Sequence, residues 1–176
     1  MKSIVLGGFM GCGKTTLGKL VAEKLHMTFT DTDDYVKKLA GVSIHDMIEA
    51  GDLAEVRRLE KQCVSELSRS EGLVIATGAG VMANEENGKA FRENCFVVFV
   101  DRDFDTVYPV ISKDPVRSLA FGKPYEEVKA LHDSRIAVYR KYAHLVVTNN
   151  GDPGDCARKI IDAYLLEEKR VTFPAS

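Results

Sequence analysis

The chain has 176 residues, enough for a single domain over residues 1–176 with a substantial core. Its 45% hydrophobic content excludes extensive disorder, and its net charge of −2 excludes the basic face that a general nucleic-acid binder needs. The apolar runs are shorter than the ~18 residues of a membrane-spanning helix, and the first run ends in glycines too early for a signal peptide. The four cysteines lack the spacing of a zinc site or a disulfide framework. We therefore expect a cytoplasmic protein with neither nucleic-acid nor membrane partners.

Apolar runs alternate with stretches of helical period along the chain. Five runs are expected to form strands: 3–6, 28–30, 73–76, 95–100 and 145–147. Their nearly continuous apolar character is typical of a parallel sheet covered on both faces. Helical spacing follows the first, fourth and fifth runs, at Leu17, Leu20, Val21 and Leu25, at Phe104, Val107 and Val110, and at Cys156, Ile160, Ile161 and Tyr164. The alternation predicts a three-layer α/β domain, with its last helix beginning near Asp152-Pro153.

Two segments interrupt this alternation. Residues 33–70 contain no strand-like run but several helical pieces, broken at Gly41 and Gly51. Residues 112–124 contain two prolines, a glycine and three basic residues, and we expect a mobile surface segment of the kind that supplies active-site lids. A plain helical insertion and an ordinary surface loop are the simpler interpretations.

Residues 8–15 carry the clearest motif. They read Gly-Phe-Met-Gly-Cys-Gly-Lys-Thr, which fits the phosphate-binding loop G-x-x-x-x-G-K-[ST] between an expected strand and an expected helix. Glycines let the backbone fold around a phosphate with its N–H groups inward, and the helix N-terminus adds positive charge. Lys14 would reach the β- and γ-phosphates, and the Thr15 hydroxyl would ligate Mg²⁺. The residues expected to bind ATP here are Gly11, Cys12, Gly13, Lys14, Thr15 and Thr16.

Asp31 and Asp33 follow the second expected strand. In an extended segment this i, i+2 spacing turns both carboxylates the same way, towards the edge of the sheet where α/β proteins bind ligands. One carboxylate would hold a magnesium-bound water, and the other would orient a substrate hydroxyl. A solvated acidic turn is the alternative, since Asp34 lies beside them.

Three further groups suit an anionic ligand. Arg57 and Glu60 form an i, i+3 helical pair, in which the carboxylate would hold an arginine fork, unless the pair lies on a solvated helix face. Residues 77–80 follow the third expected strand and form either a plain turn or a close backbone approach to a ligand. Arg117 would close over the γ-phosphate as an arginine supplied in cis. The four histidines, His26, His45, His132 and His144, have no ligand or triad spacing and are expected to be structural or surface residues.

Taken in order, these motifs resemble those of the shikimate kinases over residues 3–165. The combination is Asp31-Thr32-Asp33, Ser43-Ile44, Arg57 with Glu60, the turn Gly78-Ala79-Gly80, Arg117, and Arg135 with Tyr139. The resemblance implies a P-loop kinase fold with a five-stranded parallel sheet flanked by helices, a helical substrate-binding insertion over 33–61 and a lid over 112–124. It also implies transfer of the γ-phosphoryl of ATP to the 3-hydroxyl of shikimate, with Mg²⁺, by a monomeric cytoplasmic enzyme of aromatic amino-acid precursor synthesis.

The resemblance also implies a role for each site residue. Lys14, Asp33 and Arg117 would be catalytic, with Lys14 and Arg117 stabilising the transferring phosphoryl, and Arg117 would also bind ATP. The acceptor would be held by Asp33, Arg57, Gly78, Ala79, Gly80 and Arg135, with both of these arginines on its carboxylate. Thr15 and Asp31 would serve Mg²⁺, Asp31 through a water molecule.

A few positions depart from the family's usual pattern. Ala79 stands in a turn that usually has three glycines, and Ser118 replaces the usual lid proline. Ile48 and Val56 replace phenylalanines that usually wall the substrate pocket, and the arginine usual near the adenine has no counterpart around residues 108–109. Two alternatives stay open: a related kinase for another small anionic hydroxylated acceptor, and a non-catalytic nucleotide-binding module.

Overall fold

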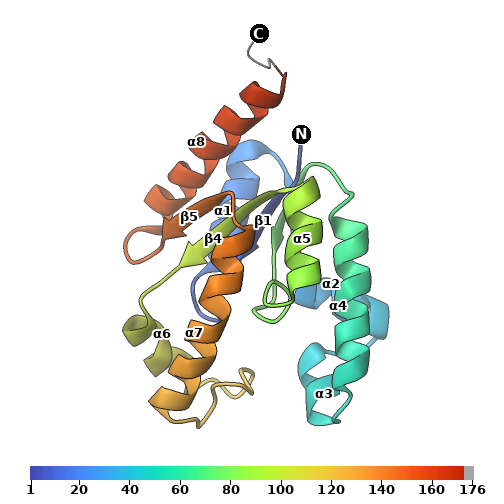
Figure 1. Ribbon diagram of the computed structural model, residues 1–176, viewed down its shortest axis with the longest axis vertical. Helices are drawn as coiled ribbons and strands as arrows, with labels where there is room; N and C mark the ends of the chain where they lie inside the picture. The colour runs from blue at the N-terminus through green and yellow to red at the C-terminus, as the bar shows by residue number, and fades with distance from the viewer. Residues whose placement is uncertain (173–176) are drawn as a thin grey trace.

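A parallel sheet forms the centre of the computed structural model, which describes residues 1–172 (Figure 1). Its five strands run in the order β2-β3-β1-β4-β5. They are β1 (Ile4–Gly7), β2 (Thr28–Asp31), β3 (Leu73–Ala76), β4 (Phe96–Asp101) and β5 (Leu145–Thr148). Every pair of neighbouring strands is parallel. The expected five-stranded parallel sheet is therefore confirmed, and each expected strand end lies within one residue of the observed end.

The helices connect the strands and cover the sheet. They are α1 (Lys14–Leu25), α2 (Thr32–Ala40), α3 (Ile44–Glu49), α4 (Leu53–Leu67), α5 (Glu85–Asn94), α6 (Phe104–Ile111), α7 (Tyr125–Tyr142) and α8 (Pro153–Thr172). The last helix begins at Pro153, where the sequence predicts its start. Among the described residues, none of these helices combines the length and apolar character needed to cross a bilayer.

Side chains along β4 point alternately to the two faces of the sheet, and this explains the three layers. Val97 and Phe99 point to one face of the sheet, into a core shared with α4, α5 and α7. Val98 and Val100 point to the other face, into a core shared with α1 and α8. A strand that is apolar on both faces must be covered on both, so the continuous apolar run and the three-layer arrangement have the same cause.

Helical spacing at Phe104, Val107 and Val110 correctly predicts α6, but the three residues do not share one face. Val110 is 65% exposed, whereas Ile111 is fully buried. Two successive steps of three residues drift away from one face of a helix with 3.6 residues per turn, so the buried face continues at i+7 rather than i+6. Val110 instead lines a cavity beside the phosphate-binding loop.

The two interruptions of the alternation lie at the same end of the molecule (Figure 1). The first consists of α2, α3 and α4, with Gly41 and Gly51 at the breaks between them, as the sequence predicts. The second, residues 112–124, runs between α6 and α7 in turns without helix or strand. Both segments therefore flank the edge of the sheet at which the loop after β1 opens.

Candidate active site

The phosphate-binding loop joins β1 to α1 with backbone angles that only glycine adopts readily. Gly13, directly before α1, has φ 98°, and a Cβ there would lie 2.5 Å from Asn149 Nδ2. That amide donates a hydrogen bond to Cys12 O at 2.8 Å, which fastens the loop to the end of β5. Cys12 is 2% exposed and packs in the core, so its side chain does not face a phosphate.

Lys14 keeps its ammonium inside the loop. Its Nζ donates to Gly8 O and Phe9 O, both at 2.9 Å, and lies 3.6 Å from Cys12 Sγ. The side chain borders a cavity of about 570 Å³, together with Gly11, Gly13, Thr15 and Thr16. Loop amides, the N-terminus of α1 and this ammonium therefore meet at one cavity, which favours a polyphosphate.

Asp31 and Asp33 lie close together, but not in the extended segment that the spacing suggested, because α2 begins at Thr32. Asp31 caps that helix, and its Oδ1 accepts a hydrogen bond from Asp33 N at 2.9 Å. Both side chains nevertheless border the phosphate cavity. Thr15 Oγ1 donates to Asp31 Oδ2 at 3.5 Å, so a hydroxyl and a carboxylate, oxygen ligands of the kind Mg²⁺ prefers, stand together there.

The Asp33 carboxyl has a shifted pKa. Burial by the surrounding protein, and then the negative charge of Asp31, raise its pKa to about 6, while Lys14 acts in the opposite direction. Water still reaches this side chain, because it faces an open cavity. Burial also raises the pKa of Asp31. A carboxyl that titrates near neutral pH suits a group that accepts a proton or a hydrogen bond from a reacting hydroxyl.

A second cavity, of about 200 Å³, adjoins the first. It is lined by Met10, Asp33, Ile44, His45, Ile48, Val56, Arg57, Glu60, Gly78, Ala79, Gly80, Val116, Arg117, Ser118, Leu119 and Arg135. The two cavities have in common Met10, Asp33, Gly78, Ala79, Val116 and Arg117. Ligands in the two cavities would therefore meet at a shared wall that carries one carboxylate and one guanidinium.

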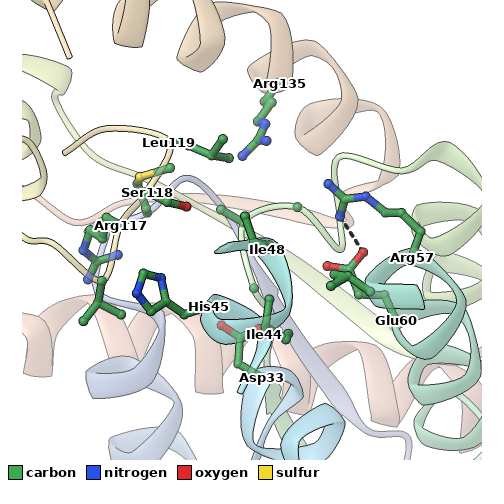
Figure 2. A pocket seen from close by; sticks show the side chains of 16 residues that line it. Asp33, Ile44, His45, Ile48, Arg57, Glu60, Arg117, Ser118, Leu119 and Arg135 are labelled. Carbon is green, nitrogen blue, oxygen red and sulfur yellow. Dashed lines mark hydrogen bonds and ion pairs between the residues drawn. The ribbon is translucent and has the colours of Figure 1, made fainter. Parts of the chain in front are cut away.

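Two arginines reach the second cavity from different helices (Figure 2). Arg57 on α4 donates to Glu60 Oε2 at 2.5 Å, and Glu60 is only 4% exposed, so the predicted ion pair belongs to the cavity rather than to a solvated helix face. Arg135 on α7 has a buried NH1 without a hydrogen-bond partner among the described residues. One turn further along α7, Tyr139 donates to Ala79 O at 2.7 Å and holds the turn after β3. Two guanidinium groups at one cavity favour an anionic ligand such as a carboxylate.

The turn after β3 allows charged side chains to pack against its backbone. A Cβ on Gly78 would collide with the Asp33 carboxylate, and a Cβ on Gly80 would lie 2.9 Å from Arg57 NH1. Side chains of the protein itself therefore approach the backbone of this turn closely, and the approach of a ligand to it stays a prediction.

Arg117 comes from the segment 112–124 and lines both cavities. Its Nε donates to Asp114 Oδ2 at 3.0 Å, and its side chain is 36% exposed. Apart from Cys12, all the residues to which the sequence analysis gives a catalytic or binding role line at least one of the two cavities.

Three polar residues near the cavities were not expected from the sequence. His45 lines the second cavity, with its Nδ1 buried and unpartnered among the described residues. Arg102 lines the first cavity, and Asn149 fastens the loop. Arg102 and Asn149 directly follow β4 and β5, so their position at the carboxyl ends of strands was an available signal. His45 lies early in α3, and only tertiary packing brings it to the cavity.

The fold and the two joined cavities define the class of protein: a P-loop phosphotransferase. A family model described as shikimate kinase matches residues 10–165. The chain therefore belongs to the shikimate kinase family, as the sequence motifs predict.

Individual relatives agree with this assignment. The chain is 37% identical over 166 residues to a shikimate kinase of Caldanaerobacter subterraneus subsp. tengcongensis, which covers 94% of this chain and 97% of the relative. It is 36% identical over 171 residues to a shikimate kinase of Caldicellulosiruptor bescii, with 97% and 99% covered. Among solved structures, the shikimate kinase from Acinetobacter baumannii in complex with shikimate superposes with a TM-score of 0.88 at 30% identity, over 95% of this chain and 94% of that chain.

Proposed function

We propose that this chain transfers the γ-phosphoryl of ATP to the 3-hydroxyl of shikimate, giving shikimate 3-phosphate and ADP. Membership of the shikimate kinase family supports the reaction. The observation that carries the proposal is the wall common to the two cavities, where Asp33 and Arg117 stand. A nucleotide held by the loop 8–15 and an acceptor held by Arg57 and Arg135 would meet at this wall.

Mg²⁺ fits the oxygen atoms beside the loop. Thr15 Oγ1 and the Asp31 carboxylate would hold it, Asp31 through a water molecule. Within residues 1–172, no three His, Cys, Asp or Glu side chains are grouped to cage a metal. This suits an ion that takes one or two protein oxygens and completes its shell with nucleotide phosphates and water. When bound, Mg²⁺ would neutralise charge on the β- and γ-phosphates.

The chemistry depends on positioning and electrostatics. The acceptor oxygen forms a bond to the γ-phosphorus, the bond from that phosphorus to the bridging oxygen breaks, and ADP leaves with the electron pair. Asp33, with a pKa of about 6, accepts the hydroxyl proton and passes it to solvent. Lys14 and Arg117 stabilise the negative charge on the transferring group, with the loop amides.

The acceptor would lie in the second cavity with its carboxylate between Arg57 and Arg135. The backbone of residues 78–80 would border its ring. In this proposal residues 33–61 form the acceptor-binding insertion and residues 112–124 form the lid of one kinase domain over 1–176. We also propose a monomer that acts in the cytoplasm. The four cysteines are free thiols, which suits a reducing compartment.

The proposal is tested by ADP release with and without shikimate, in the presence of ATP and Mg²⁺. We expect release that depends on shikimate, and a loss of about 100-fold or more in turnover for Lys14→Ala, because an ammonium aimed at developing charge contributes a few kcal/mol. Lys19→Ala, which removes an exposed lysine from the same helix, is the matched control. Shikimate-independent release, or normal turnover in folded Lys14→Ala, would contradict the proposal.

A further inference from the structure

Arg102 is a cation that the mechanism above does not use. It directly follows β4 and lines the phosphate cavity beside the loop 8–15. Its NH1 donates to Gly11 O at 3.4 Å, which is long for such a bond. Its Nε is buried and has no hydrogen-bond partner in the part of the chain that the structure describes. The guanidinium is therefore anchored only loosely, and one of its donors is unused.

Two carboxylates close to Arg102 in the sequence, those of Asp101 and Asp105, are engaged by other groups. Asp101 Oδ2 accepts a hydrogen bond from Arg140 at 3.0 Å, and Asp105 Oδ1 accepts one from Tyr125 at 2.6 Å. No ion pair between residues 1–172 includes Arg102, whereas Arg57 and Arg117 each have a carboxylate partner. A partly buried guanidinium without a counter-charge is unfavourable unless an anion completes its environment.

We propose that Arg102 binds the phosphate chain of the nucleotide, as a second fixed positive charge beside Lys14. This proposal deepens the proposed function and rests on its nucleotide half. Phosphates held by the loop would lie next to Gly11, whose carbonyl already anchors the guanidinium. An arginine fork offers several N–H donors to phosphate oxygens, which would replace the long bond to Gly11 and satisfy Nε.

Stacking of the guanidinium on adenine is the competing use of the same residue. It would leave Nε without an acceptor, because a ring face offers no oxygen in the guanidinium plane. The two uses differ in a measurable way. Inorganic tripolyphosphate has phosphates but no base. Arg102 can therefore contact it through phosphate oxygens but cannot stack on it.

The test compares Arg102→Gln with the wild-type protein by calorimetric titration of ADP and of inorganic tripolyphosphate. We expect both dissociation constants to rise about tenfold or more, because hydrogen bonds to charged groups are the strong ones. Arg102→Lys, which keeps the charge, should recover part of the loss. Arg92→Gln is the matched control, because Arg92 also donates to a backbone carbonyl, Ala143 O, but lies outside both cavities.

Two results would overturn the proposal. The first is that folded Arg102→Gln binds both ligands within about twofold of wild type. The second is that ADP binding weakens while tripolyphosphate binding does not, which would indicate stacking. If Arg102→Gln does not fold, the neutral variant Arg102→Met takes its place in both titrations, and Arg102→Lys remains the variant that keeps the charge. Failure of shikimate phosphorylation with intact, Arg102-dependent ADP binding would contradict only the acceptor half of the proposed function.

Discussion

Asp33 is the residue at which the proposed function and the stability of the fold oppose each other. Its pKa rises from 3.8 in a free carboxyl to about 6 in the fold, mainly through burial. Between these pH values the folded protein keeps a proton that the unfolded chain loses, so the free energy of unfolding decreases as the pH rises through this window. Above pH 6 the ionised carboxylate therefore destabilises the fold, although it is the form that accepts a proton.

Asp33→Asn should stabilise the protein at pH 7.5 and remove most of its activity. The rise of the Asp33 pKa to about 6 sets an upper limit on the effect, and water in the open cavity screens the charge, so we expect a gain of about 1 kcal/mol. The gain should vanish below about pH 4, where the carboxyl is protonated in both the folded and the unfolded chain. Urea unfolding at both pH values measures this, with the exposed neighbour in Asp34→Asn as control. If Asp33→Asn lowered the free energy of unfolding by the same amount at both pH values, burial would not destabilise the ionised carboxylate.

Arg57 and Arg58 allow a matched pair of substitutions on one helix. Arg57 faces the second cavity and pairs with buried Glu60, whereas Arg58 pairs with Glu55 at 2.6 Å on the exposed side. Arg57→Lys keeps the charge but loses the bidentate fork, so we expect the KM for shikimate to rise about 10-fold or more. Arg58→Lys should leave it unchanged. Steady-state kinetics measure the KM for shikimate of both variants. Equal values would show that Arg57 does not bind the carboxylate of shikimate.

At the scale of elements, the proposal that residues 112–124 form a lid depends on the guanidinium of Arg117. Arg117 borders both cavities and is held by Asp114 of the same segment. If it reaches the γ-phosphoryl mainly in the transition state, Arg117→Ala should lower kcat about 100-fold or more and change the KM for shikimate little. Lys123→Ala is the control, because this lid lysine pairs with Glu127 and lines neither cavity. A normal kcat with a raised KM would make Arg117 an acceptor-binding residue instead.

Strands and helices differ in how far the sequence predicts them. The strands are correct to one residue because continuous apolar runs flanked by glycine or polar residues have few alternatives in a covered parallel sheet. The start of α2 was not predicted, because Asp31 caps it by accepting from Asp33 N, a local bond that ends the extended segment early. Of the three residues whose spacing predicts α6, Val110 lies off the buried face, which continues instead at Ile111.

In the candidate site, too, the sequence predicts some features better than others. Motifs with short spacing, such as residues 8–15 and the pair Arg57–Glu60, predict local geometry well. Contacts made across the fold, such as Arg102 to Gly11 O, depend on which strand ends become neighbours, and strand order is not encoded in spacing alone. The sequence therefore identifies the chemistry more completely than it identifies the walls of the cavities.

At the scale of the whole molecule, the strand order brings the site together. Because β1 lies between β3 and β4, the loop 8–15 opens between the turn after β3 and Arg102 after β4. The helices α2 to α4 and the segment 112–124 then enclose the second cavity beside it (Figure 2). One fold thus provides two cavities with a common wall, which the proposed function assigns to the nucleotide and to the acceptor.

The most direct test of the central claim is a comparison of acceptors. Initial rates with ATP and Mg²⁺ would be measured for shikimate, quinate, gluconate and nucleoside monophosphates, and kcat/KM compared. We expect shikimate to give the highest kcat/KM. Ile48 and Val56 are smaller than the phenylalanines usual in the family. We expect this difference to change the preference between acceptors by about 1–3 kcal/mol, which alters how far shikimate exceeds the others in kcat/KM without changing its rank. A higher kcat/KM for another acceptor would contradict the account, and the first residues to examine would be those two and Ala79.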